Sequence, residues 1–189
     1  MLALSYAAHH PERVRSLALI GCGTYDLDAR AGFQQAIDAR ITLADHARIE
    51  ELKAQLESAT DPAGHDRLLG ELERIFGEAE SFDPFPPAHL AVPLPGDGPG
   101  FNETWTDVLR LQEQGIEPAA FSSIEAPALM LHGDDGPHPG PAIRDSLRLF
   151  IPHLEYTGLP RCGHTPWRER RAREPFLRIL SEWLAANPD

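Results

Sequence analysis

Residues 128–135 read ALMLHGDD, an apolar run that ends at a glycine and then presents two carboxylates. Residues 159–167 read LPRCGHTPW, where a second short strand-like segment leads to a glycine and then to His164. Strands of an open α/β sheet present reactive side chains in this way, at their carboxyl ends. The ordered pair, with a helix-sized segment between its two members, therefore predicts an α/β fold.

The segments around this pair alternate between strand and helix. Residues 2–8 predict a helix that Pro11 ends, and residues 14–20 predict a buried parallel strand. After the strand at 127–131 we expect a helix at 141–150, a strand at 154–159 and a last helix at 174–186. This order is typical of a parallel sheet covered by helices.

A long helical excursion interrupts the alternation. Apolar residues recur at helical spacing between Ala31 and Gly77, which predicts two or three amphipathic helices. The many prolines and glycines of residues 81–100 predict a loop. A further helix is expected from Asn102 to Gln114, with Gly115 as its stop.

Composition excludes several classes of function. The 189 residues carry a net charge of −12 and are 42% hydrophobic, so we expect a globular protein of one domain or one and a half, and no nucleic-acid partner. No apolar run reaches the roughly 20 residues that cross a bilayer, and no secretory signal is recognisable. Cys22 and Cys162 lack metal-site spacing and form no disulfide framework, which fits a cytoplasmic location.

His164 is the best catalytic candidate. It follows a strand and a glycine, the placement that a general base needs beside a nucleophile. The plain alternative is a hydrogen-bonded loop histidine. A dense group of titratable residues (His132, Asp134, Asp135 and His138) hints weakly at a metal site, but one loop hardly converges four ligands, so we expect neither a metal nor a cofactor.

Two other features have simpler readings. Trp105, with its neighbours Glu103 and Thr104, is a candidate for lining a substrate pocket, although packing explains the ring more simply. The charge run from Arg168 to Arg173 is typical of a solvated face at a helix start.

Four stretches resemble the rear part of an α/β-hydrolase with a helical cap. Residues 2–14 resemble the helix behind the nucleophile elbow, and residues 17–21 the strand that follows. Residues 127–135 resemble the strand that bears the acid, and residues 163–169 (GHTPWRE) the histidine loop, where Trp167 is a second candidate for contact with substrate. The resemblance implies a hydrolase core at 1–30 and 119–189 and a cap at 31–118.

The family mechanism uses a serine, a histidine and an acid, and only the histidine transfers directly, onto His164. No Gly-x-Ser-x-Gly elbow occurs in the chain; we expect it upstream of Met1, since Ser5 lies inside a helix without flanking glycines. The usual acid position holds Gly136. Asp135 replaces the acid if the loop shifts by one residue, and Asp26 and Asp28 are looser candidates.

The resemblance thus implies an ancestral hydrolase of an ester, an amide or a similar bond in a small-molecule substrate, and an N-terminally truncated chain that is nearly inactive alone. The alternative is a non-catalytic relic or a binding scaffold. An incomplete sheet would also expose an edge through which the chain self-associates.

Overall fold

The structure is a computed structural model that describes residues 2–24, 27–86 and 98–188. Three strands form one parallel sheet in the order β1-β2-β3, with β1 at Leu17–Ile20, β2 at Ala128–Gly133 and β3 at Glu155–Leu159. The α/β fold class predicted from the strand and helix alternation is confirmed.

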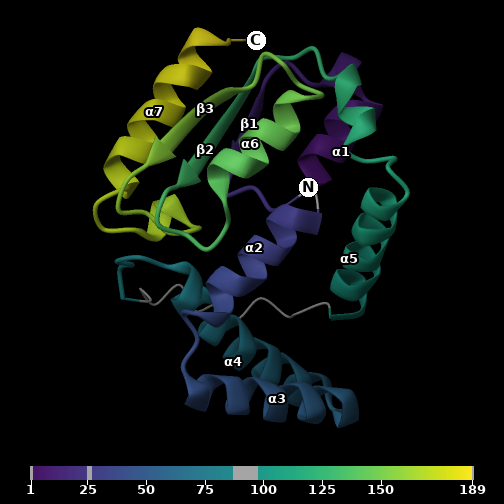
Figure 1. Ribbon diagram of the computed structural model, residues 1–189, viewed down its shortest axis with the longest axis vertical. Helices are drawn as coiled ribbons and strands as arrows, with labels where there is room; N and C mark the ends of the chain where they lie inside the picture. Colours follow the sequence, from purple (N-terminus) through teal and green to yellow (C-terminus); the bar gives the residue numbers. More distant parts are fainter. Residues whose placement is uncertain (1, 25–26, 87–97, 189) are drawn as a thin grey trace.

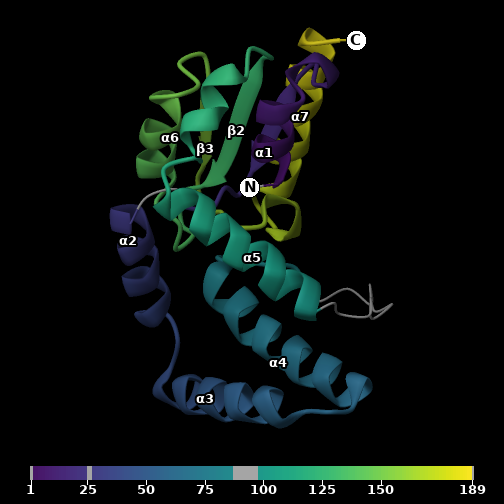
Figure 2. The ribbon, with the colours of Figure 1, turned by 90° about the vertical axis from the view of Figure 1, so that its right-hand side faces the viewer.

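Helices cover both faces of this sheet. The helices α1 (Leu2–His9) and α6 (Gly140–Arg148), with the 3-10 turn η2 (Ala119–Ser123), lie on one face, and α7 (Arg173–Ala186) lies on the other (Figures 1 and 2). Short 3-10 turns η1 (Pro11–Arg13) and η3 (Pro166–Arg168) follow α1 and precede α7. Pro11 ends the first helix, as expected.

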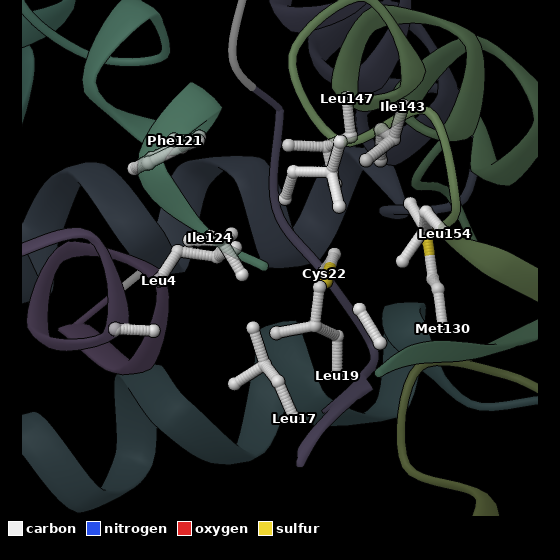
Figure 3. Close-up of a cluster of buried hydrophobic side chains, with 13 residues drawn as sticks. Leu4, Leu17, Leu19, Cys22, Phe121, Ile124, Met130, Ile143, Leu147 and Leu154 are labelled. Atoms are coloured by element: carbon white, nitrogen blue, oxygen red, sulfur yellow. The ribbon is translucent and has the colours of Figure 1, made fainter. Parts of the chain in front are cut away.

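Side chains of each strand alternate between the two faces, because successive Cβ atoms of a strand point to opposite sides. Leu17, Leu19 and Met130 belong to the cluster under α1 and α6, whereas Leu129 and Leu131 pack against α7. Figure 3 shows the first cluster, which joins Leu4, Leu17, Leu19, Cys22, Phe121, Ile124, Met130, Ile143, Leu147 and Leu154. Every residue of β2 is buried, so this strand is the centre of the core.

The insertion contains the helices α2 (Leu27–Asp38), α3 (Leu43–Ser58), α4 (Pro62–Glu80) and α5 (Gly98–Glu113). The first of them starts four residues before the expected Ala31, and α5 begins inside the segment expected as a loop. Residues 87–97 of that loop lie outside the described residues. Gly115 has a φ of +68° just after α5, in the left-handed region that glycine adopts without strain.

The helices α2, α3 and α4 have an apolar cluster of their own, formed by Ile37, Ile41, Ile49, Leu52 and Ile75. Two side chains fix where these helices begin, because Thr42 accepts a hydrogen bond from the Asp45 N–H and Asp61 accepts one from the Gly64 N–H. Figure 1 shows this group beyond the arrowheads of the strands, so it faces the edge where parallel strands present their functional side chains. Among the described residues, no helix is both long and apolar enough to cross a membrane.

Candidate active site

His164 lies on the loop after β3, close to the end of β1. Its backbone N–H donates to the carbonyl of Glu80, the last residue of α4, at 2.9 Å. A Cβ atom built on Gly21 would lie only 2.6 Å from the His164 carbonyl oxygen, and Gly21 has a φ of +59°. Glycine is therefore required at the end of β1 for the histidine loop to approach this closely.

The His164 imidazole is half-buried in a small aromatic stack. Its ring centroid lies 4.4 Å from that of His138, which is also stacked on Phe33 of α2 at 4.2 Å. The Nδ1 atoms of His164 and His138 are buried and have no hydrogen-bond partner in the part of the chain that the structure describes. The loop after β2, the loop after β3 and the helical insertion thus meet at this imidazole.

Burial lowers the pKa of His164, and the neighbouring His138 adds to this, while the charge of Glu80 opposes it. For Glu80, burial opposes ionisation, but the interaction with His138 and the charges of His164 and His138 lower its pKa overall. At neutral pH the imidazole of His164 is therefore uncharged, and a neutral imidazole is the form that accepts a proton.

The position expected for the triad acid carries no side chain. A Cβ atom built on Gly136 would lie 3.4 Å from the backbone nitrogen of His164, so a side chain at this position would start beside the histidine loop. The Asp135 carboxylate instead accepts the Arg161 N–H at 2.7 Å. Asp134 is exposed at the end of β2. The structure thus brings Asp135 to the histidine loop, and its carboxylate bonds to the loop backbone.

The remaining candidates for the acid lie elsewhere in the chain. Asp26 is outside the described residues, and Asp28 is in the first turn of α2, where its side chain is not described.

His132 is almost completely buried at the end of β2. Its Nε2 lies 3.2 Å from the His138 carbonyl oxygen, and burial lowers its pKa to about 4. Within the described part of the chain, no group of three or more histidine, cysteine, aspartate or glutamate side chains is arranged to hold a metal ion. Burial raises the pKa of both Cys22 and Cys162 to about 12, so neither thiol is a thiolate nucleophile at neutral pH.

The two tryptophans proposed for substrate contact are both partly exposed. Trp105 on α5 has 43% of its surface exposed, and Trp167 in η3 has 46% exposed with its ring 6.1 Å from that of Phe176. A pocket of about 690 Å³ lies between α1 and α5 and is lined by Glu103 and Thr104. Another, of about 440 Å³, lies where α4 meets the loop after β2 and is lined by Arg40, Thr42, Phe82 and Asp135.

The interpretation of the charge run 168–173 as a solvated face is wrong at Glu169, which is completely buried. Its Oε1 accepts the N–H groups of Phe82 at 2.9 Å and Gly163 at 3.1 Å, and its Oε2 accepts that of Asp83 at 2.7 Å. Its arginine neighbours do face solvent. Nothing in the local sequence distinguishes Glu169, because it stands among arginines in a run of charged residues.

Comparison with known proteins places the chain among hydrolases by similarity. It is 28% identical to a 2-hydroxymuconate semialdehyde hydrolase of Pseudomonas putida, over 97% of this chain and 58% of that protein. It is 27% identical to a 2-hydroxy-6-oxo-2,4-heptadienoate hydrolase, also from Pseudomonas putida, over 98% of this chain and 60% of that protein. The chain thus spans about three-fifths of the length of the curated relatives it matches. No family model matches it.

Solved structures give a weaker likeness. A proline iminopeptidase from Mycobacterium smegmatis matches with a TM-score of 0.49 and 17% identity, over 99% of this chain and 62% of that protein. A loop variant of a haloalkane dehalogenase from Bradyrhizobium elkanii matches with a TM-score of 0.44 and 16% identity, over 98% of this chain and 63% of that protein. At this level of similarity these neighbours carry no information on function. The similarity to the two curated hydrolases, over nearly the whole chain, agrees with the resemblance to α/β-hydrolases described in the sequence analysis.

Proposed function

We propose that this chain forms part of the active site of a hydrolase for small organic substrates, with His164 as the general base. The observation that carries the proposal is the position of His164 at the carboxyl edge of the sheet, pressed against the end of β1. A base must be held rigidly and must be uncharged to accept a proton, and burial lowers the pKa of this imidazole. Proton transfer by such a group contributes about 10²- to 10⁴-fold to a reaction rate.

The substrate class follows from the two curated relatives. Both are named for small unsaturated carboxylates with a 2-hydroxy group. We extend that class to this chain, beside the more general ester or amide of a small acyl group. The 440 Å³ pocket has the volume of an ordinary small-molecule site, but its lining holds Asp45, Glu78 and Asp135 beside Arg40 and does not include His164, so it does not support the substrate class.

We further propose that residues 31–118 act as a cap that selects this substrate. The helices α2 to α4 lie beyond the carboxyl ends of the strands (Figure 1), and Phe33 reaches the histidine stack from α2. Trp105 and Trp167 stay candidates for contact with the substrate.

The chain alone is not expected to catalyse acyl transfer. Its sequence holds no Gly-x-Ser-x-Gly elbow, and loss of the nucleophile costs a serine hydrolase on the order of a million-fold in turnover. A fluorophosphonate probe tests this directly. The 189-residue chain should remain unlabelled, and a serine that becomes labelled contradicts the proposal.

The role of His164 is tested on the longest in-frame polypeptide that the gene expresses, with the two relatives' substrates and simple aryl esters. We expect His164→Ala to reduce hydrolysis at least about a hundredfold. The matched control is His153→Ala, since His153 is an exposed histidine that bonds to the Ala126 carbonyl and precedes β3, whereas His164 follows that strand. Equal activity of the two variants would refute the role of His164.

Two observations favour a second candidate, a non-catalytic relic or binding scaffold. No described residue forms a hydrogen bond with the His164 Nδ1, and Gly136 stands where an acid is expected. Titration calorimetry with the same carboxylates would then detect binding by the chain without any turnover by the longer polypeptide.

Three further proposals concern the chain as a whole. The strand β1 is an edge of the described sheet, and Leu2 and Tyr6 on the adjacent α1 are exposed, so we propose self-association through this side. Sedimentation at several concentrations tests it. The charge of −12 disfavours nucleic acid as a partner, and two cysteines with free thiols are consistent with a cytoplasmic location.

A further inference from the structure

Among the described residues, no carboxylate forms a hydrogen bond with the His164 Nδ1. A histidine base usually relies on such a group, which orients the ring and stabilises the imidazolium that forms. Position 136 holds glycine, and the Asp135 carboxylate is engaged by the Arg161 N–H. Another source of negative charge close to this ring therefore has to be sought outside the loop after β2.

Glu80, at the end of α4, lies next to the histidine pair. Its Oε1 is 3.8 Å from the Nε2 of His138, whose ring centroid is 4.4 Å from that of His164. The Glu80 carbonyl oxygen also accepts the His164 N–H at 2.9 Å. The same residue thus contacts His164 through its backbone and reaches the neighbouring imidazole through its side chain.

The contact between α4 and the histidine loop is fixed from both sides by one buried carboxylate. Glu169 accepts the N–H groups of Phe82 and Asp83, which follow α4, and that of Gly163, which precedes His164. A further backbone bond, from the Phe85 N–H to the Arg168 carbonyl at 2.7 Å, lies beside it. Hydrogen bonds to a charged acceptor are about twice as strong as neutral ones, so this junction is held firmly.

We propose that Glu80 is the carboxylate that supports His164, acting across His138, and that Glu169 holds Glu80 in place for this task. The inference rests on the proposed role of His164 as the base. When His164 takes up a proton from a nucleophile, the negative charge of Glu80 stabilises the resulting imidazolium, and Glu80 itself gains and loses no proton. The cap would then contribute a positioning residue to the reaction as well as a wall to the pocket.

Other ionisable groups face this cluster and belong in its titration. The Nε2 of His132, on β2, lies 3.2 Å from the His138 carbonyl oxygen. Arg40, just after α2, donates to the carbonyl oxygens of Ala79 and Asp135. Neither of them reverses the sign of the expected effect, because both are unchanged in the variants described next.

The test is an NMR titration of the imidazole C–H signals in the 189-residue chain. We expect Glu80→Gln to lower the pKa of His164 by about half a pH unit or more, the effect of removing one charge several ångströms away in a partly buried site. Glu78→Gln is the matched control, because Glu78 lies on the same helix, is exposed and pairs with Arg74. It should leave the pKa of His164 unchanged.

A second variant guards against a purely structural effect. Gly136→Asp, placed in the Glu80→Gln chain, should raise the pKa of His164 again, because the new carboxylate is attached beside the histidine loop, with its Cβ 3.4 Å from the backbone nitrogen of His164. The proposal is overturned if Glu80→Gln folds normally and leaves the pKa of His164 unchanged, or if Glu78→Gln shifts it equally.

The outcome is separable from that of the proposed function. A shift on Glu80→Gln together with full hydrolysis by the His164→Ala polypeptide would refute His164 as the base while the electrostatic coupling stands. Loss of hydrolysis on His164→Ala without any shift on Glu80→Gln would refute the role of Glu80 alone.

Discussion

Glu169→Gln is the perturbation that reports most directly on the junction between the helical insertion and the histidine loop. The wild-type carboxylate accepts three backbone N–H groups, two on Oε1 and one on Oε2, and the side chain is completely buried. A glutamine has the same size and keeps one acceptor oxygen. The side-chain NH₂ group of the glutamine, however, faces at least one of the three backbone N–H donors, and that donor then loses its hydrogen-bond acceptor.

The expected cost follows from this geometry. A buried donor left without an acceptor costs about 1–3 kcal/mol, and the surviving bonds weaken because their acceptor is no longer charged. We therefore expect Glu169→Gln to lower the free energy of unfolding by about 2–4 kcal/mol. For a chain of this size that corresponds to a fall in Tm of roughly 5–15 °C.

Thermal and urea unfolding, followed by circular dichroism, measure this loss, and amide hydrogen exchange locates it. Exchange should accelerate at Phe82, Asp83 and Gly163 before it does so in β2. Glu182→Gln is the control, because Glu182 is an exposed member of a helical pair with Arg178 and should change stability by less than about 0.5 kcal/mol. If Glu169→Gln has the same Tm as the control and the same amide exchange as the wild type, the Glu169 carboxylate does not hold α4 and the histidine loop together.

Three further predictions follow from other parts of the structure. Burial lowers the pKa of His132 to about 4, so its contribution to stability is fully present above its unfolded pKa near 6.5 and is lost as the pH falls toward 4. In urea titrations, the free energy of unfolding should fall by about 2–3 kcal/mol between pH 7 and pH 4.5, and by clearly less in His132→Gln. If the longest in-frame polypeptide hydrolyses a substrate, Gly136→Asp should raise kcat at least about tenfold, since a well-placed acid is worth roughly 10⁴-fold in a complete triad. An unchanged or lower kcat would contradict the view that the acid is missing at position 136. Thr42→Ala removes the cap of α3 and should cost about 1 kcal/mol in thermal melts, whereas Thr104→Ala, inside α5, serves as a helix-interior comparison.

The sheet was predictable from the sequence because its signal is local. Two continuous apolar runs, Leu17 to Ile20 and Ala128 to Leu131, have the pattern of strands buried on both faces. The first is followed directly by Gly21 and the second, after His132, by Gly133. The helices of the insertion were predictable from their apolar periodicity. Their boundaries moved by a few residues, at Leu27 and Gly98, because helix ends depend on contacts that periodicity does not contain.

The surroundings of His164 were only partly predictable. The histidine itself carries a local signal, namely its position after a strand and a glycine. Glu80 is the last residue of an amphipathic helix, and Glu169 is one charge among many, so nothing near them in the sequence distinguishes them from solvated neighbours. Their positions depend on how residues 80–85 meet residues 163–170, a contact between segments more than 75 positions apart.

The self-contained apolar cluster of α2, α3 and α4 has a consequence for engineering. Because Ile37, Ile49, Leu52 and Ile75 pack mainly on one another, the three-helix unit brings its own core wherever it is joined. A chimera that exchanges residues 34–78 for the corresponding helices of a related protein would keep Phe33, Glu80, Glu169 and the sheet of this chain in place. Under the proposed function, substrate preference and the chemistry of the histidine are then two properties that laboratory evolution can alter separately.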